Sequence, residues 1–371
     1  MTQVPENVTE FREQVAEFLS GRAAHLDGWQ YFRDRSGITA DLYRQLGSMG
    51  WLSVSWPLAD GGLGRSADFE FALWDEMAYA RAAKPPIAAG LIARSIIENG
   101  TKAQKEFFLP GIAKGTLAFA LGYSEPEAGS DLSSLRTTAQ PDGDVYIVQG
   151  EKRWTSDAHH ADYLWLLCRT GSRTSRAQGL TLLIADLASP QIEITPIETL
   201  DGHRVNEVRL DDVAIPIENR IGEEGGAWTI IQEALARERH LQVLPGRLRR
   251  DLEQLIEWAF ASEALTSDAT QRVIAEMAAS VEAITATADE IVRLVIDGQD
   301  TLVISACQKL VGTDLMQQIA RFPSSVGDQA QVIVGNPFEF MWRESILETI
   351  AGGTSEVMSS IVARRGLGLG S

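Results

Sequence analysis

The chain has 371 residues, of which 44% are hydrophobic and 23% are charged, and its formal net charge is −18. This composition predicts a globular protein of two or three domains, and the acidic balance excludes the basic face that a nucleic-acid binder needs. The two cysteines, Cys168 and Cys307, are too few and too far apart for a disulfide framework or a zinc site. The first residues lack the basic and apolar regions of a secretion signal, and no apolar stretch reaches the ~18 residues that span a membrane. We therefore expect a cytoplasmic protein that makes no contact with a membrane.

The first 120 residues have helical periodicity. Apolar residues recur at spacings of three and four over residues 8–19 and form one stripe. Thr101 and Gln104 match the T-x-x-Q capping box that begins a helix, and Pro110 is expected to end that helix. The glycines of residues 61–64 predict a loop rather than a dinucleotide fingerprint, because no strand precedes them.

Between residues 121 and 224 the pattern changes to short runs rich in Val, Ile, Leu and aromatic residues. These runs predict an antiparallel β domain, since none of them alternates with a long helix as in a doubly wound sheet. Long amphipathic patterns return after residue 225 and predict a helical bundle. The sequence thus predicts an α+β fold with an N-terminal helical domain (1–120), a middle β domain (121–224) and a C-terminal four-helix bundle domain (225–371).

The segment GYSEPEAGSDLSSLRTTA, residues 122–139, gathers small hydroxyl residues, glycines and acids in one loop. Small residues let backbone N–H groups approach a ligand closely. Because no Lys or Arg precedes Arg136 in this run, the loop suits a neutral hydrogen-bonding ligand better than a phosphate. The alternative interpretation is a surface turn between domains.

The segment EKRWTSDA places Trp154 before two hydroxyl residues, Thr155 and Ser156, at the end of a predicted strand. An indole there can stack beside a flat aromatic ligand while the hydroxyls bond its polar edge. The alternative is that Trp154 belongs to the core. His159 and His160 are neighbours that point to opposite faces of an extended chain, so we expect loop residues and no metal site.

These segments together resemble the acyl-CoA dehydrogenase family. The motifs SEPEAGSD and EKRWTSDA, the later VNEVRLDDVAIP and IGEEGGAW, and the early GTKAQKEFFLP are similar to segments of that family. The resemblance extends from about residue 8 to about residue 365. It implies an α–β–α architecture, an FAD cofactor and α,β-dehydrogenation of an acyl-CoA thioester.

The resemblance also implies roles for residues of the first loop. Ser124 and the backbone amide of Tyr123 would contact the pyrimidine edge of the flavin, and Gly129 would allow the close approach of the cofactor. Ser130 would lie near the pantetheine of the substrate, at the border of the cofactor site.

The remaining cofactor residues come from two other segments. By resemblance, Trp154 would flank the isoalloxazine ring, and Thr155 and Ser156 would contact its edge, with Ser156 near N5. Thr354 and Glu356 match positions that hold the ribityl and pyrophosphate side of FAD.

The position of the catalytic base departs from the common pattern. Most members carry a glutamate before the Gly-Thr pair of the C-terminal segment, and here, in IAGGTSEV, the matching residue is Gly352. Its N–H could still bind the substrate carbonyl. A subset of the family carries the base on the first long helix of the C-terminal domain, directly before an arginine. Glu238 and Arg239 occupy that place, so Glu238 is the candidate base and Arg239 a candidate substrate contact.

Two interpretations of Glu238 are open from the sequence. A carboxylate buried beside a flavin would have a raised pKa, which suits a base that works near neutrality. Alternatively, Glu238 is one charge in an Arg–Glu–Arg run on a solvated helix face.

A further departure concerns the cofactor phosphates. The family's R-x-x-F-G stretch offers an arginine to a neighbouring subunit, and the corresponding region, EWAFASEALTSDATQRVIAEMA, lacks it. The later glutamine-and-glycine motif is degraded to QAQVIVGNPFEF. These losses predict a hetero-oligomer, α2β2, in which a homologous partner subunit supplies the clamp, as in bacterial enzymes of this family that act on bulky steroid side-chain thioesters. By analogy, we expect an electron-transferring flavoprotein as electron acceptor.

Three functions remain open at this point. The first is a catalytic FAD-dependent acyl-CoA dehydrogenase subunit in lipid or steroid catabolism. The second is a non-catalytic structural partner of such an enzyme, with a decaying flavin site. The third is a flavin oxidase or monooxygenase on the same fold.

Overall fold

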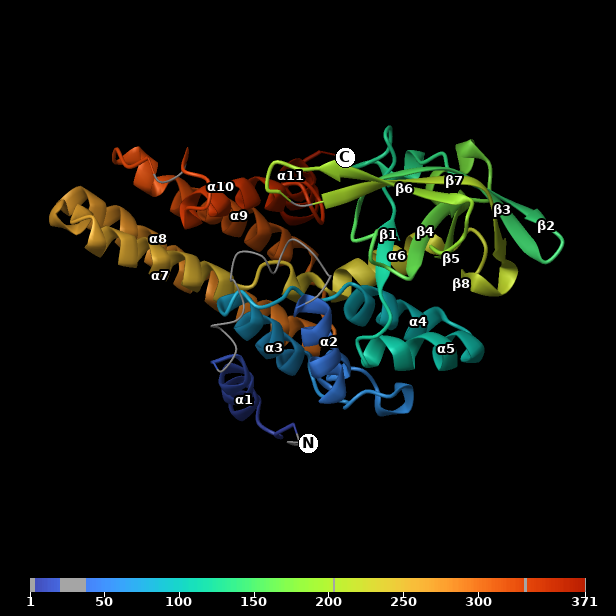
Figure 1. Ribbon diagram of the computed structural model, residues 1–371, viewed down its shortest axis with the longest axis horizontal. Coiled ribbons are helices and arrows are strands. Elements are labelled where there is room, and N and C mark those ends of the chain that lie inside the picture. The colour runs from blue at the N-terminus through green and yellow to red at the C-terminus, as the bar shows by residue number, and fades with distance from the viewer. Residues whose placement is uncertain (1–3, 21–37, 203, 330–331, 371) are drawn as a thin grey trace. The chain divides into compact units, whose positions relative to one another are not determined.

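The computed structural model describes residues 4–20, 38–202, 204–329 and 332–370 of the chain. They divide into two compact units (Figure 1). The described part of the first unit is residues 38–65, 85–202 and 204–238, and that of the second is residues 4–20, 66–84, 239–329 and 332–370. The boundaries of the three sequence-based domains stay a prediction.

The first unit contains an eight-stranded sheet and four helices of the described chain. The helices are α2 (Ile38–Ser48), α4 (Ala93–Asn99), α5 (Lys102–Ala113) and α6 (Ala227–Arg237). The strands are β1 (Phe119–Gly122), β2 (Thr138–Asp142), β3 (Val145–Ser156), β4 (Tyr163–Arg169), β5 (Leu180–Asp186), β6 (Ile192–Glu198), β7 (Arg204–Pro216) and β8 (Arg220–Ile221).

The sheet has the strand order β6-β7-β3-β2-β4-β5-β8, and β1 pairs with β4. Its pairs are antiparallel except that β1 and β2 run parallel to β4. The predicted β domain is confirmed as mainly antiparallel, although the short strands β1, β2 and β8 were not predicted. Alternate residues of β3 and β4, such as Val148, Leu164 and Leu166, are fully buried in one apolar cluster. Cys168 fills a place in the same cluster and is a free thiol.

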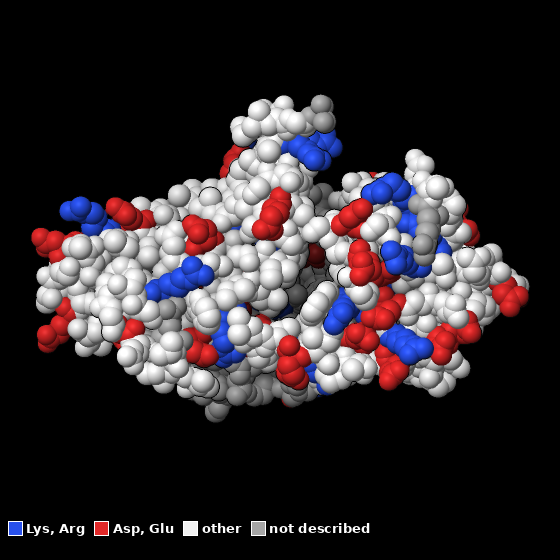
Figure 2. Space-filling view, turned by 90° about the horizontal axis from the view of Figure 1, so that it is seen from above, with Lys and Arg blue, Asp and Glu red and all other residues white. Residues whose placement is uncertain are grey.

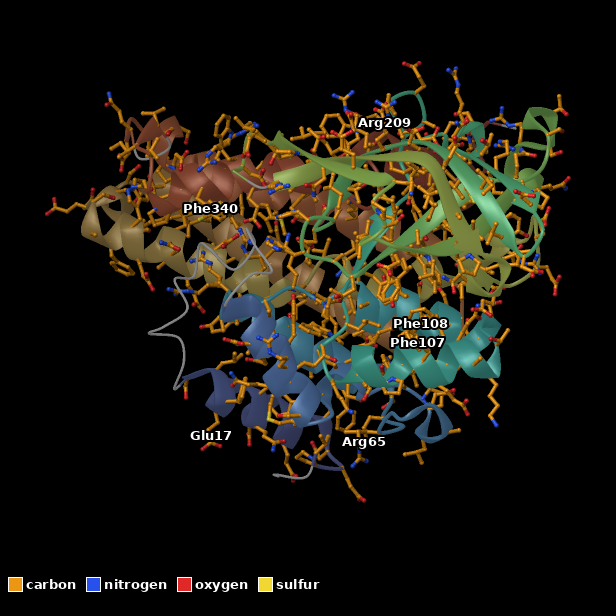
Figure 3. The ribbon with its side chains drawn as sticks, turned by 45° about the vertical axis from the view of Figure 1, so that its right-hand side comes forward. Glu17, Arg65, Phe107, Phe108, Arg209 and Phe340 are labelled. Carbon is orange, nitrogen blue, oxygen red and sulfur yellow. The ribbon has the colours of Figure 1, made fainter. Side chains whose placement is uncertain are left out.

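A buried aromatic side chain of helix α5 packs on the sheet. Phe108, labelled in Figure 3, meets the rings of Phe119 and Tyr163 at centroid distances of 5.8 and 5.3 Å. The neighbouring Phe107 is 64% exposed. This buried ring therefore packs α5 against the starts of β1 and β4.

The predicted beginning of α5 is confirmed, but its predicted end is wrong. The Thr101 hydroxyl accepts from the N–H of Gln104, and the Gln104 side chain accepts from the N–H of Thr101. The helix does not end at Pro110 and continues to Ala113. Burial of Ile112 on the next turn favours this continuation, because it offsets the one hydrogen bond that a proline removes.

The second unit is helical throughout its described elements. Its helices are α1 (Val8–Ser20), α3 (Ala67–Tyr79), α7 (Pro245–Ala261), α8 (Asp268–Ile296), α9 (Leu302–Ser325), α10 (Pro337–Glu348) and α11 (Ser355–Ile361). Helices α7 and α8 lie side by side, and α9 contacts α7, α8 and α10 (Figure 1). The apolar stripe predicted for residues 8–19 is buried in α1, at Phe11, Val15 and Leu19.

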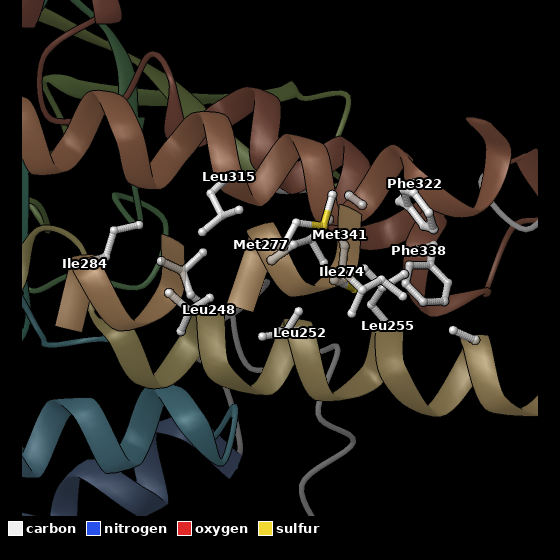
Figure 4. Packing of buried hydrophobic residues seen from close by; sticks show 14 of the residues in the cluster. Leu248, Leu252, Leu255, Ile274, Met277, Ile284, Leu315, Phe322, Phe338 and Met341 are labelled. Atoms are coloured by element: carbon white, nitrogen blue, oxygen red, sulfur yellow. The ribbon is translucent and has the colours of Figure 1, made fainter. Parts of the chain in front are cut away.

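The core of this helical unit is built from apolar side chains of α7 to α10 (Figure 4). Met277, Val281 and Ile284 of α8 recur at spacings of four and three, and each is at most 5% exposed. They pack with Leu255 of α7 and Met341 of α10 in the same cluster. The α+β fold class, with its C-terminal bundle, is therefore confirmed.

The sequence predicts no membrane-spanning helix and no basic face, and both predictions can be compared with the described residues. Across that part of the chain, helices with the length and hydropathy of a membrane span are absent. On the face in Figure 2, acidic and basic side chains of the described residues are interspersed, and no continuous basic area is visible.

Candidate active site

A buried ion pair anchors the loop of residues 122–139. Glu125 is 6% exposed, and its carboxylate accepts from the Lys152 ammonium at 2.7 Å and from the N–H groups of Arg136 and Thr137 at 2.6 and 2.9 Å. Lys152 is fully buried in β3 and also donates to the carbonyl of Tyr123 at 3.2 Å. Burial opposes ionisation of Glu125, but the Lys152 charge and the donated hydrogen bonds lower the pKa of this carboxyl below its usual value.

This ion pair was missed in the sequence. In the sequence, Glu125 is one of three acids in the loop and Lys152 is one residue of the EKRW run, and neither pattern indicates a pair. The available signal was the even spacing of Lys152 from the apolar Tyr146 and Val148 on the same strand, because a lysine buried on that face needs an acidic partner.

The same loop joins the two segments predicted to bind the flavin. The carbonyl of Ser124 accepts from the N–H of Arg153 at 2.9 Å, so the start of the loop lies beside the end of β3. Gly129 and Ser130 are exposed, and a Cβ at Gly129 would meet no atom within 4 Å. The outer side of this loop is therefore open to a ligand.

Trp154 is exposed and held by an irregular backbone. Strand β3 is bulged between Lys152 and Thr155, and Trp154 has φ +63°, which a bulky residue rarely adopts. Its side chain is 54% exposed, and the guanidinium carbon of Arg153 lies 5.0 Å from the indole centroid. Trp154 is therefore not a core residue, and the part of its ring that Arg153 leaves uncovered is available for stacking.

The next two residues point in different directions. Ser156 is exposed, whereas Thr155 is 1% exposed and its carbonyl accepts from Asn206 Nδ2 at 2.9 Å. The Thr155 hydroxyl is buried and has no hydrogen-bond partner among the described residues. Of the two predicted hydroxyls, Ser156 shares the exposed side of the strand with Trp154. His159, in the following turn, contacts Asn206, and no cluster of metal-ligating side chains occurs in the described chain.

Glu238 is turned into the first unit. It caps the C-terminus of α6, and its side chain is partly buried. Oε1 lies so close to Gly90 that a Cβ at that glycine would be only 1.9 Å away. Burial raises the pKa of the Tyr123 phenol, and the nearby charge of Glu238 raises it further. The interpretation of Glu238 as a charge on a solvated helix face is therefore wrong. The side chain of Arg239 lies outside the described ones.

Tyr123 completes this end of the site. Its side chain is 9% exposed, and its phenol oxygen accepts from Trp165 Nε1 at 3.2 Å. Tyr123 directly precedes Ser124 in the loop, and its phenol is near enough to Glu238 to be affected by the charge of that carboxylate. The structure brings the predicted base and the predicted flavin loop to one region of the first unit.

The second unit contains the C-terminal turn. Gly352 has φ +66° and Gly353 has φ +103°, and the Gly352 carbonyl accepts from Gln242 Nε2 at 2.9 Å. A glutamate at position 352 would pay about 1–2 kcal/mol for this left-handed backbone. The backbone of this turn therefore favours glycine at position 352 over the glutamate that the resemblance would lead one to expect there.

Thr354 and Glu356 begin helix α11 directly after the turn. The Thr354 hydroxyl accepts from the N–H of Val357 at 3.3 Å, as an N-cap does. Glu356 is exposed, and hydrogen bonds from its own N–H and from Thr354 lower its pKa. Both residues have a local structural role, and their roles toward the cofactor stay predictions.

Lys309 of α9 holds the turn around Gly352 through two hydrogen bonds. It is 3% exposed and donates to the carbonyls of Ala351 and Gly353, the latter at 2.6 Å. Burial lowers the pKa of this ammonium to about 8, and the charge of Glu348 opposes the shift only in part. This role could not be predicted from the sequence, because Lys309 lies in an otherwise ordinary helical pattern.

We expect the burial of Lys309 to make stability rise with pH. Between pH 8 and pH 10 the unfolded chain holds a proton on Lys309 that the folded chain has lost, so the free energy of unfolding increases. Relative to Lys309→Met, the native chain should gain about 2 kcal/mol between pH 7 and pH 10. Urea unfolding of both proteins at the two pH values measures this difference. A difference that stays constant with pH would contradict the assignment.

Comparisons with known proteins match the whole architecture. Family models for the N-terminal, middle and C-terminal domains of acyl-CoA dehydrogenase match residues 5–116, 120–213 and 225–367. Acyl-CoA dehydrogenase FadE26 of Mycobacterium tuberculosis is 35% identical over 345 residues, which cover 88% of this chain and 86% of that protein. Acyl-CoA dehydrogenase FadE29 of the same organism is 30% identical, with 96% of each chain covered.

Two solved structures match this chain over nearly its whole length. The Tcur3481-Tcur3483 steroid ACAD superposes with a TM-score of 0.91 at 30% identity, over 99% of this chain and 98% of that one. The ChsE4-ChsE5 complex from Mycobacterium tuberculosis gives a TM-score of 0.90 at 31% identity, with both chains fully covered. On its three matched domains and its close relatives, this chain belongs to the acyl-CoA dehydrogenase family.

Proposed function

We propose that this chain is the base-bearing subunit of a heteromeric, FAD-dependent dehydrogenase that acts on a bulky acyl-CoA thioester. One observation carries the proposal: the Glu238 carboxylate faces the interior beside Tyr123, in the same unit as the predicted flavin loop. A carboxylate in such a place suits abstraction of the α-proton of a thioester.

The side chains around Trp154 fit the ring of a flavin. An exposed indole, the exposed hydroxyl of Ser156 and the open loop at Gly129 offer a stacking face and hydrogen-bonding groups. The buried hydroxyl of Thr155 still lacks a partner among the described residues. When bound, FAD would supply the hydride acceptor at N5. The chain would hold the ring against Trp154, with Ser124 and Tyr123 at its pyrimidine edge.

The remaining assignments extend this proposal to the substrate. Ser130 would contact the pantetheine, and the N–H of Gly352 would bind the thioester carbonyl. Lys309 would keep the turn of Gly352 in one conformation through the carbonyls on either side. Thr354 and Glu356 would lie toward the ribityl and pyrophosphate side of the cofactor, and Arg239 toward the substrate.

A second, homologous chain would complete the cofactor site. The names of two close structural relatives describe the paired chains Tcur3481-Tcur3483 and ChsE4-ChsE5, and one of them is called a steroid ACAD. The segment that follows Glu257 lacks the family's arginine for the FAD phosphates. We therefore propose an α2β2 assembly with a steroid side-chain thioester as substrate and an electron-transferring flavoprotein as electron acceptor.

Co-expression with a homologous neighbouring gene tests the assembly. Native mass spectrometry and flavin absorbance should give two chains of each kind and half an FAD per chain. A stable homotetramer of this chain with one FAD per subunit would contradict it. Straight, branched and steroid thioesters, compared by kcat/KM in the assembled complex, identify the acyl group.

A further inference from the structure

We infer that Gly90 is a positioning residue for Glu238, because the side chain that glycine lacks leaves the space that the carboxylate oxygen occupies. The inference rests on the proposed function, in which Glu238 is the base. It concerns a residue of the N-terminal part of the chain that no motif of the sequence singled out.

The carboxylate of Glu238 lies against a backbone segment that hydrogen bonds hold in place. Gly90 lies in a buried π-helical turn, Ala88–Ile92, that leads into α4. The N–H of Ile92 donates to the carbonyl of Ile87 at 3.1 Å, and the indole of the buried Trp56 donates to the carbonyl of Ala89 at 2.9 Å. Such π turns are frequent at functional sites. The turn therefore presents the Cα of Gly90 to Glu238 in one conformation.

The backbone of this turn does not itself require a glycine. Gly90 is not among the residues with positive φ, so an alanine could adopt the same conformation. Alanine would also cost less conformational entropy in a helical turn. The use of glycine here needs another reason.

That reason is the carboxylate. A Cβ at position 90 would lie 1.9 Å from Oε1 of Glu238, 3.1 Å from its Cδ and 3.9 Å from its Cγ. These three atoms are the nearest neighbours of the added carbon, and all belong to one flexible side chain. A methyl group at position 90 would therefore displace the carboxylate and leave the surrounding backbone in place.

The close approach has a chemical consequence. Main chain without a side chain covers one side of the carboxylate and keeps water from it, and Tyr123 lies nearby within the same unit. Loss of solvent on one side strengthens a carboxylate as a base and restricts it to few orientations. Gly90 would thus set both where Glu238 points and how strongly it attracts a proton.

Gly90→Ala in the assembled complex tests the inference. We expect the rate of flavin reduction by the thioester to fall at least tenfold, with binding of a non-reactive thioester analogue unchanged. Gly111→Ala in α5 is the matched control: its Cβ would meet Leu117 at 3.0 Å, away from Glu238, and the rate should stay within twofold. The Gly90→Ala/Glu238→Asp double variant should reduce flavin faster than Gly90→Ala, because a shorter side chain makes room.

A thermal unfolding cycle provides a readout that is independent of activity. Gly90→Ala should lower Tm in the native background but raise it in a Glu238→Ala background, where the methyl group has space. A rate unchanged by Gly90→Ala, or the same Tm shift in both backgrounds, would overturn the inference. If Glu238→Gln itself leaves the rate intact, the proposed function fails instead, whatever Gly90→Ala does to Tm.

Discussion

Glu238→Gln in the assembled complex is expected to slow reduction of the flavin by an acyl-CoA by a factor of about 10²–10⁴, the usual contribution of a general base. Glutamine has nearly the same shape, so it should keep its place beside Gly90 and preserve the fold. It cannot accept the α-proton, and no other carboxylate is proposed for that step. Anaerobic stopped-flow measurement of flavin bleaching gives the rate.

Glu233→Gln is the matched control for this prediction. Glu233 is on the same helix, α6, and is exposed to solvent. Its amide variant should therefore reduce flavin at the native rate. If Glu238→Gln also turns over at that rate, the base belongs to the partner chain, and this chain is the non-catalytic subunit.

Glu125→Gln is expected to lower the free energy of unfolding by about 3–5 kcal/mol, because it leaves the buried ammonium of Lys152 without its counter-charge. The amide keeps only one acceptor oxygen for the two loop N–H groups, of Arg136 and Thr137, that the two carboxylate oxygens now accept from, so affinity for FAD should fall with stability. Urea unfolding and flavin titration measure the two effects. Because the folded-state pKa of Glu125 is lowered, this stabilisation is present above the ordinary pKa of a glutamate and is lost as pH falls through the folded value.

Two further variants make this prediction specific. Glu125→Gln combined with Lys152→Met removes both charges and should recover much of the lost stability. Glu290→Gln breaks the exposed pair with Arg293 on α8 and should cost far less stability than Glu125→Gln, because solvent screens an exposed pair. Equal losses from the buried and the exposed pair would show that Glu125 does not anchor the loop.

The parts of the fold that depend on local patterns could be predicted from the sequence. The stripe of α8 and the capping box of α5 are set by residues three and four apart, and both are confirmed. The end of α5 could not be predicted, because burial of Ile112 against the rest of the unit outweighs the local signal of Pro110. The parallel pairing of β1 with β4 also depends on distant segments.

The candidate site also contains some residues that could be predicted from the sequence and others that could not. Trp154 and Ser124 carry a recognisable motif, and the structure places their segments side by side. The role of Glu125 could not be predicted, because it depends on a partner, Lys152, that is distant in the sequence. Gly90 could not be found at all from the sequence, since a missing side chain has a role only when the group that fills its space is known.

The left-handed backbone at Gly352 has a consequence for the evolution of such enzymes. Once this turn has settled into a conformation that suits glycine, reinstating an acid there strains the chain before any catalytic gain appears. Relocation of the base would then be hard to reverse, because restoring the original base requires the backbone of the turn and the side chain at position 352 to change together.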